Sequence, residues 1–369
     1  MGTLILADGT VIKGESFGAL GGWEGEIVFN TSMTGYQEIL TDPSYAKQIV
    51  VMTYPEIGNY GINDYDFESE KPALVGLVVK NYSKKESHYK SRESLSEYLK
   101  QKNIIALENI DTRSLVKKIR ETGCMPAFIT SNDVDEIFIT EKLDDLQKFK
   151  INSDIILDVT TDARFIYNPQ GKIDVAFIDY GAKNGILQSL ARRGCKLTVY
   201  PARVTAKEIL QNKFDAVFLS NGPGDPADCK YQINQIKELT GKVPIFGICL
   251  GYQLLALATG AATYKLKYGH RGGNHPVINL ENNKVMMTSQ NHGYAVDIDS
   301  LPKIIRPTYK NLNDDTLEGF EISSLNIYAV QFHPEANPGP DDASIIFDEW
   351  VNIMQNNINN RINEVKNER

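Results

Sequence analysis

The sequence lacks the features that mark several large classes of protein. Its 369 residues contain only four cysteines, widely spaced and without a Cys-x-x-Cys pair. This pattern argues against a disulfide framework or a cysteine-based zinc site and favours reduced thiols in the cytoplasm. No run of 18 apolar residues is present, so we expect no membrane-spanning helix. The first residues lack the basic segment of a secretory signal, and we expect none.

The chain also lacks an excess of basic residues. Its 39 Lys and Arg are outnumbered by 47 Asp and Glu, which gives a formal net charge of −8. Nucleic-acid-binding proteins normally carry a basic patch, whereas the basic residues here are spread along the chain. We therefore expect no nucleic-acid partner. A hydrophobic content of 42% and a charged content of 23% are ordinary for a globular protein.

Two domains are expected, because 369 residues exceed one ordinary hydrophobic core and the pattern of predicted strands and helices changes along the chain. Residues 1–150, with an Asp-Gly hairpin signal at residues 8–9, predict a smaller α+β domain. Residues 151–171 are predicted to be a linker, 172–360 an α/β domain and 361–369 a polar tail. In the α/β domain strand and helix patterns alternate, which is typical of an open, mostly parallel sheet with flanking helices.

The most informative stretch is a strand, a glycine-flanked cysteine and a helix. The apolar run 243–248 predicts a buried strand, and residues 253–258 favour a helix. Gly247 and Gly251 flank Cys249 at a spacing of two, which keeps side chains out of a sharp turn and raises the central residue above the sheet. At a helix N-terminus the dipole favours the thiolate. A buried structural cysteine is the alternative, but the two glycines favour a nucleophile.

A cysteine nucleophile needs a base, and five histidines are available. His333 is the best candidate because it directly follows the apolar strand 327–332, and Pro334 cannot continue that strand. It therefore lies at the carboxyl edge of the sheet, where Cys249 is also expected. Glu335, two residues further on, can orient the imidazole and complete a Cys–His–Glu triad.

The other histidines are weaker candidates. His88 lies in a charged segment, and His292 is flanked by asparagine and glycine, so that substrate binding and backbone packing are both open. His270 and His275 frame a polar segment with no carboxylate or cysteine pattern nearby. We therefore favour hydrogen bonding within a loop over a metal site, and predict no metal.

An acyl-transfer site also needs N–H donors for an oxyanion. The amide of Leu250, directly after the nucleophile, is one candidate. The loop Gly222-Pro223-Gly224 is another, because glycine lets the backbone approach a ligand closely. The loop lacks the Lys-Ser/Thr pair of a phosphate-binding P-loop, and by itself it is a weak signal.

Three motifs, in this order, resemble those of the class I (triad) glutamine amidotransferases. They are Asn221-Gly-Pro-Gly-Asp-Pro226, Gly247-Ile-Cys-Leu-Gly251 with Gln253, and His333-Pro-Glu335. Segments 32–45, 269–276 and 289–293 look like those of the small subunit of carbamoyl-phosphate synthetase, and this resemblance covers nearly the whole chain. Two departures are Tyr252 and Tyr294, where the family commonly has histidine and phenylalanine.

The resemblance implies a glutamine-hydrolysing enzyme of the EC 6.3.5.5 type. Cys249 would form a γ-glutamyl thioester with L-glutamine, with His333 as base and acid and Glu335 orienting it. Ammonia would pass to a large synthetase subunit that makes carbamoyl phosphate from bicarbonate and ATP, within a cytoplasmic heterodimer that serves pyrimidine or arginine biosynthesis. No cofactor is expected in this chain, since ATP and Mg belong to the partner. The family's glutamine contacts fall on Ser44, Gly222, Gly224, Leu250, Gln253, Asn291, Gly293 and Tyr294.

Two other functions stay open on the sequence. A stand-alone cysteine amidase or hydrolase on the same fold would turn over at full rate without a partner. A non-catalytic regulatory or scaffold subunit would have no need for Cys249, His333 and Glu335 together, which speaks against it. The role of residues 1–150 as the docking surface for the large subunit is implied by the resemblance alone.

Overall fold

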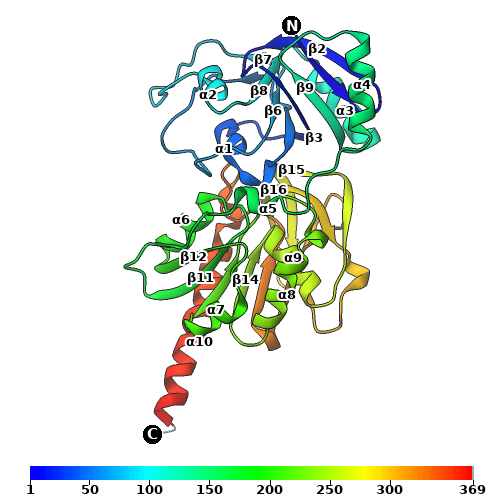
Figure 1. The fold of residues 1–369 in the computed structure, drawn as a ribbon. Coiled ribbons are helices and arrows are strands. Elements are labelled where there is room, and N and C mark those ends of the chain that lie inside the picture. Colours follow the sequence, from blue (N-terminus) through cyan, green and yellow to red (C-terminus); the bar gives the residue numbers. More distant parts are fainter. Residues whose placement is uncertain (368–369) are drawn as a thin grey trace. The chain divides into compact units, whose positions relative to one another are not determined.

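The computed structural model describes residues 1–367, which form two compact units (Figure 1). The first unit comprises Met1–Asn152 together with Leu266–Gly272, and the second comprises Ser153–Lys265 and the chain from Gly273 onward. Each unit has its own buried apolar clusters.

The first unit is built on a closed barrel with the strand order β1-β2-β8-β6-β4-β3-β9. The predicted Asp-Gly hairpin joins β1 to β2, and Gly9 supplies the positive φ of 88° that the turn needs. Closure of the barrel was not predicted, because it depends on strands far apart in the sequence. The strands are β1 Gly2–Leu6, β2 Val11–Ser16, β3 Gly22–Asn30, β4 Gln48–Met52, β6 Gly76–Val78, β8 Ile105–Glu108 and β9 Met125–Thr130.

Helices and a small two-stranded sheet complete the first unit. Ser94 and Glu97 form a capping box at the start of α2, and Asp111 caps α3, whose Leu115 and Ile119 enter the barrel core. The α+β character expected for this part of the chain is confirmed. The elements are α1 Tyr36–Thr41, α2 Leu95–Gln101, α3 Thr112–Thr122, α4 Glu136–Leu146, β5 Glu56–Ile57 and β7 Asn81–Tyr82.

The second unit contains a ten-stranded sheet with the order β10-β12-β11-β13-β14-β19-β18-β16-β15-β17. Strands β12, β11, β13, β14 and β19 are parallel neighbours, and an antiparallel part follows β19. The predicted open, mostly parallel sheet is therefore confirmed at the part that carries the cysteine motif. The strands are β10 Phe165–Tyr167, β11 Ile173–Asp179, β12 Cys195–Pro201, β13 Ala216–Leu219, β14 Ile245–Ile248, β15 Thr263–Asn279, β16 Val285–Val296, β17 Arg306–Asn311, β18 Leu317–Ile322 and β19 Ile327–Val330.

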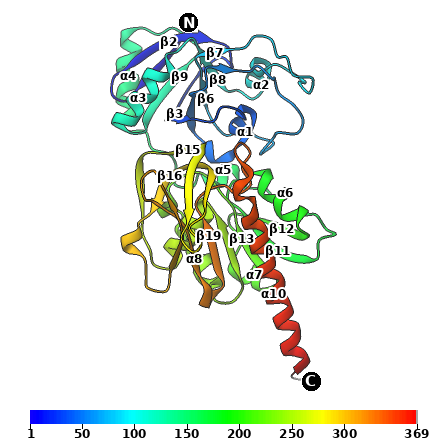
Figure 2. The same ribbon diagram turned by 180° about the vertical axis from the view of Figure 1, so that it is seen from behind.

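Helices cover both faces of this sheet, because consecutive apolar residues of a buried parallel strand point to opposite faces. Ala176 and Ile178 of β11 pack with α7, α8 and α9, whereas Val175 and Phe177 pack with α6 and α10. Figure 2 shows α10 lying across the strands. The helices are α5 Ile156–Val159, α6 Asn184–Arg192, α7 Ala206–Gln211, α8 Lys230–Leu239, α9 Leu250–Ala258 and α10 Ile345–Asn367.

One predicted loop is wrong, because the segment is a strand. His270 and His275 lie in β15, and the polar segment 288–293 is part of β16. A polar side chain of β16 bonds to the backbone of β15, since the Thr288 hydroxyl donates to the His275 carbonyl at 2.8 Å. Helix α10 also continues to Asn367, and the last two residues of the predicted tail 361–369 lie outside the described residues.

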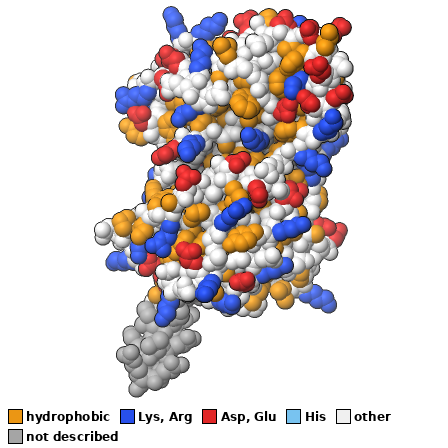
Figure 3. Space-filling model, in the orientation of Figure 1, with side chains coloured by type: hydrophobic (Ala, Val, Ile, Leu, Met, Phe, Trp, Pro, Cys, Tyr) orange, Lys and Arg blue, Asp and Glu red, His pale blue; other side chains and the backbone are white. Residues whose placement is uncertain are grey.

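Charged side chains of both signs are interspersed on the face of the molecule that Figure 3 draws. None of the described helices is long and apolar enough to cross a bilayer.

Replacement of Trp350 by alanine tests the packing of α10 on the sheet. The Trp350 ring is buried and lies 5.8 Å from the Phe218 ring and 5.4 Å from the Phe246 ring. Trp350→Ala should lower the free energy of unfolding of the second unit by about 3–5 kcal/mol, because it leaves a cavity among these rings. Urea unfolding monitored by circular dichroism measures it. Phe165→Ala, at a 42% exposed position, should cost clearly less; equal losses would contradict the packing described here.

Candidate active site

Cys249 occupies a sharp turn between strand β14 and helix α9. Its backbone has φ 54° and ψ −103°, a conformation that L residues rarely adopt, and its N–H donates to the Val330 carbonyl at 2.9 Å. A Cβ added at Gly251 would lie 2.4 Å from the Leu219 carbonyl oxygen, and one at Gly247 would lie 2.8 Å from the Gly251 backbone. The turn therefore excludes side chains at both flanking positions, and the predicted strand–turn–helix is present.

His333 reaches the same edge of the sheet from the neighbouring strand. Strand β19 pairs in parallel with β14, with Ile248 opposite Val330, so the residues that follow the two strands emerge side by side. The His333 N–H donates to the Ser289 carbonyl at 2.9 Å, which fixes the backbone at this point. The sequence prediction of His333 at the carboxyl edge thus agrees with the sheet register.

The His333 ring is oriented by Glu335. Its Nδ1 lies 2.6 Å from the Glu335 Oε1, and both side chains are buried. Its Nε2 has no hydrogen-bond partner among the described residues. One ring nitrogen is therefore committed to the carboxylate, and the other is left for the reacting groups.

Electrostatics favour a charged His333–Glu335 pair. Burial by itself lowers the pKa of His333, but the Glu335 carboxylate and the Cys249 thiol outweigh it and raise this pKa to about 10. For Glu335 burial raises the pKa, and the opposing charges of Lys183 and His333 bring it down to about 2. Both shifts of pKa favour the charged forms, an imidazolium and a carboxylate.

Lys183 belongs to this cluster, and the sequence reasoning missed it. Its Nζ lies 3.0 Å from the Glu335 Oε1 and donates to the Ala336 carbonyl at 2.6 Å. Its backbone N–H donates to the Asn221 Oδ1 at 3.0 Å. The one available signal was its position just after strand β11, at the carboxyl edge of the sheet; a lysine there is by default a surface residue, but this one is 3% exposed.

The glycine loop after β13 lies against the start of α9. A Cβ at Gly222 would lie 2.3 Å from the Tyr180 carbonyl oxygen and 2.8 Å from the Leu250 side chain, and Gly224 has φ 96°. Only glycine fits at either position. The structure thus brings Gly222 and Leu250 together, as the sequence predicted for two parts of one site.

Strand β16 brings the other predicted contacts to the nucleophile. The Cys249 thiol lies 3.7 Å from the Asn291 carbonyl oxygen, and the Gln253 Nε2 donates to the Tyr294 carbonyl at 2.8 Å. Asn291, Gly293 and Tyr294 all lie on β16. Ser44 lies in the first unit, where its N–H donates to the Asp42 Oδ1 at 2.9 Å, so its contact with glutamine stays a prediction.

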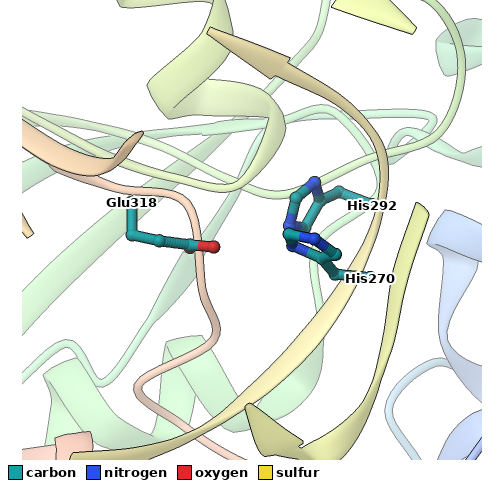
Figure 4. A group of neighbouring side chains, drawn as sticks. All are labelled: His270, His292 and Glu318. Carbon is teal, nitrogen blue, oxygen red and sulfur yellow. The ribbon is translucent and has the colours of Figure 1, made fainter. Parts of the chain in front are cut away.

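His292 makes hydrogen bonds within its own strand. Its Nδ1 lies 2.7 Å from the Tyr294 carbonyl oxygen and its Nε2 lies 2.9 Å from the Gln290 Oε1. Figure 4 shows its ring with the carboxylate of Glu318 pointing toward it. His270, also drawn there, lies in the 266–272 segment of the first unit. Of the two roles left open for His292, the structure shows packing against the backbone.

Two family models match the chain. Residues 4–129 match the model described as carbamoyl-phosphate synthase small chain, CPSase domain, and residues 176–353 match glutamine amidotransferase class-I. Together they cover most of the sequence. The chain belongs to the carbamoyl-phosphate synthase small chain family.

Relatives match over the whole length of this family member. The carbamoyl phosphate synthase small chain of Oceanobacillus iheyensis is 48% identical over 353 residues, 95% of each chain. The pyrimidine-specific small chain of Bacillus subtilis is 47% identical over 352 residues, again 95% of each chain. The small chain of Clostridium perfringens is 48% identical, covering 94% of this chain and 98% of the relative. The resemblance is confirmed, and the protein is a glutamine-hydrolysing amidotransferase of the EC 6.3.5.5 type.

Lys183→Met tests whether the buried lysine holds Glu335 in its charged form. The variant leaves a buried carboxylate without its cation, so stability should fall by about 3–5 kcal/mol and glutamine hydrolysis should drop strongly. Urea unfolding and a glutamate-release assay measure the two effects. Lys196→Met removes a partly exposed lysine that pairs with Asp174 at 2.7 Å and should cost about 1 kcal/mol or less. Normal stability and activity in Lys183→Met would refute this role.

Proposed function

We propose that this chain hydrolyses L-glutamine through a γ-glutamyl thioester on Cys249 and delivers the ammonia to a large synthetase subunit. The observation that carries the proposal is the buried His333–Glu335 pair, joined by a 2.6 Å contact, on the strand next to a cysteine held in a strand-to-helix turn. A nucleophile, a base and an orienting carboxylate are the parts that such chemistry requires.

In the first half-reaction the Cys249 thiolate attacks the carboxamide carbon of glutamine. The imidazolium of His333 gives its Nε2 proton to the departing nitrogen, which leaves as ammonia, and the γ-glutamyl thioester remains. Glu335 keeps the Nδ1 proton in place and stabilises the imidazolium before the transfer. The raised pKa of His333 supports this assignment, since it favours a ring that carries the proton to be donated.

In the second half-reaction water attacks the thioester carbon. His333, now neutral, takes a proton from the water at Nε2, glutamate leaves, and the Cys249 thiolate and the imidazolium are restored. Backbone N–H groups stabilise the oxyanion in both steps. The Leu250 amide at the start of α9 is one donor, since the first N–H groups of a helix have no partner within it. The loop at Gly222 and Gly224 supplies a second.

The glutamine contacts of the proposal are the eight residues implied by the family, from Ser44 to Tyr294. The chemistry of the triad needs no cofactor in this chain, and the proposal leaves ATP, Mg and bicarbonate to the partner. The partner itself is supported by the relatives, which are named small chains and thereby imply a large one. The four free cysteines fit a reducing compartment such as the cytoplasm.

Cys249→Ser should abolish glutamine hydrolysis and glutamine-dependent carbamoyl phosphate formation, while ammonia-dependent synthesis by the complex stays at the normal rate. A hydroxyl at this position is far less ionised than a thiol and cannot start the reaction. The measurement compares glutamine with ammonium chloride as nitrogen donor in the complex with a large subunit.

Cys124→Ser, which changes a partly exposed thiol of the first unit, is the matched control and should keep both activities. Labelling by a glutamine-like diazoketone, followed by mass spectrometry, should modify Cys249 alone. Glutamine-dependent activity in Cys249→Ser would disprove the thioester mechanism, and full hydrolysis without stimulation by the large subunit would favour a stand-alone amidase.

Glu335→Gln tests the electrostatic role of the carboxylate. Because Glu335 raises the pKa of His333, its neutral analogue lowers that pKa, and the imidazolium is lost at a lower pH. The basic limb of the pH profile of kcat/KM for glutamine should therefore move to lower pH, and kcat should fall by roughly 10²- to 10⁴-fold. Steady-state kinetics over a pH series measures both. Glu349→Gln, on α10, is the control; an unmoved limb in Glu335→Gln would show that the carboxylate does not set this pKa.

A further inference from the structure

The second unit contains another buried carboxylate, Glu318, which the proposed reaction does not use. Glu318 lies on β18 and has no exposed surface. Its Oε1 accepts a hydrogen bond from the Asn311 Nδ2 at 2.9 Å, and its Oε2 accepts one from the Gln290 Nε2 at 2.9 Å. Both oxygens act as acceptors for amide donors.

The orientations of the two amides are fixed by their other contacts. The Asn311 Oδ1 accepts from the Asn313 N–H at 2.9 Å, so the Asn311 Nδ2 must face Glu318. Since the Gln290 Nε2 also faces Glu318, the Gln290 Oε1 faces His292, 2.9 Å from its Nε2. The carboxylate thus determines which end of the Gln290 amide His292 meets.

Both ring nitrogens of His292 face oxygens that can only accept. Nε2 faces the Gln290 Oε1, and Nδ1 lies 2.7 Å from the carbonyl oxygen of Tyr294. With the Gln290 amide in this orientation, each contact takes a proton on the ring nitrogen, as an imidazolium provides. A ring nitrogen of His292 and a carboxylate oxygen of Glu318 lie within 4.8 Å of each other, with the carboxylate pointing toward the ring (Figure 4).

The imidazolium holds the part of β16 that is expected to bind glutamine. Its Nδ1–H shares the Tyr294 carbonyl with the Gln253 Nε2, which donates to it at 2.8 Å. Gln253 lies on α9, one turn after Cys249, and the Cys249 thiol contacts the Asn291 carbonyl. The bond from Gln253 therefore joins β16 to the helix that follows the nucleophile, and the bond from His292 fixes the Tyr294 carbonyl that accepts it.

We propose that Glu318 is a positioning residue for glutamine binding: acting through Gln290, it keeps His292 doubly protonated, and His292 holds the Asn291–Tyr294 segment in place. The effect on binding rests on the proposed function, because these residues are the expected glutamine contacts. The protonation of His292 does not rest on it.

Tyr252 provides a second connection to the same strand. Its buried hydroxyl donates to the Leu317 carbonyl at 3.0 Å, directly before Glu318, and its ring lies 5.1 Å from the Phe320 ring. The tyrosine that stands where the family commonly has histidine thus ties α9 to β18. This bond fixes the position of β18 at Glu318 relative to α9, the helix that follows Cys249.

Glu318→Gln tests the proposal without changing the size of the side chain. The new amide must present its oxygen to Asn311, whose orientation is fixed, and its NH2 group to Gln290. Gln290 then turns over and presents its own NH2 group to the His292 Nε2, which must become an acceptor. We expect His292 to lose the Nε2 proton and to keep the Nδ1 proton.

Nitrogen-15 NMR of the full-length protein with labelled histidine measures this directly, and His292→Asn identifies the signals. In the unchanged protein both nitrogens of His292 should have the shifts of a protonated ring at pH 7.5; in Glu318→Gln the Nε2 shift should move to that of an unprotonated nitrogen. A neutral His292 in the unchanged protein, or an imidazolium that persists in Glu318→Gln, would overturn the proposal.

Kinetics then tests the consequence for binding. In Glu318→Gln the KM for glutamine should rise about tenfold with kcat changed less than about twofold, because a charge-assisted hydrogen bond to Tyr294 becomes an ordinary one. Glu321→Gln, on the same strand but paired with Arg306, should leave KM unchanged. An unchanged KM in Glu318→Gln would reject the positioning role.

Two further results separate this proposal from others. If Glu318→Gln does not fold, Gln290→Met removes the same connection, and His292 should again lose its Nε2 proton; an unchanged imidazolium there would count against the relay. If the unchanged protein hydrolyses no glutamine, the proposed function fails, while the NMR result still decides the protonation of His292.

Discussion

Close packing of the backbone around the Cys249 turn is the constraint on which the site depends. The residue can hold its positive φ because Gly247 and Gly251 carry no side chain, and because its N–H is fixed to Val330. The hydrogen bond from the Cys249 N–H to the Val330 carbonyl also belongs to the register in which β14 pairs with β19. That register determines where the chain leaves β19, and hence that His333 emerges beside the nucleophile.

A buried charge needs a partner, and the requirement explains the composition of the cluster behind His333. A buried imidazolium without Glu335 would lose its proton, and a buried carboxylate without cations would gain one. Lys183 balances the second charge and also binds the Ala336 carbonyl, just after Glu335. The His333–Glu335 pair is therefore held by a lysine from the turn after β11, a strand that only β13 separates from β14.

The turn at Cys249 and the placement of His333 and Glu335 at the same edge of the sheet could be predicted because each depends on a short pattern: glycines around Cys249, and an apolar strand followed by His333 and Pro334. The roles of Lys183 and Glu318 could not be predicted, because their partners come from other strands and no spacing in the local sequence indicates them. The closed barrel was not predicted for the same reason, because its closure pairs strands that lie far apart in the sequence. The segment of His270 and His275 was taken for a loop because its polar residues were interpreted as exposed, whereas it belongs to a long strand.

The hydrogen bonds that the backbone carbonyls of β16 accept explain why so polar a segment is extended. Its Ser289 carbonyl fixes the backbone of His333, while its Tyr294 carbonyl accepts from both His292 and Gln253. A loop could offer the same carbonyls but would have to be ordered each time glutamine binds, at a cost in conformational entropy. A strand offers them already in place. The proposed imidazolium at His292 adds a charge beside the Tyr294 carbonyl, so that a buried acid on β18 supports the part of β16 that lies next to Cys249.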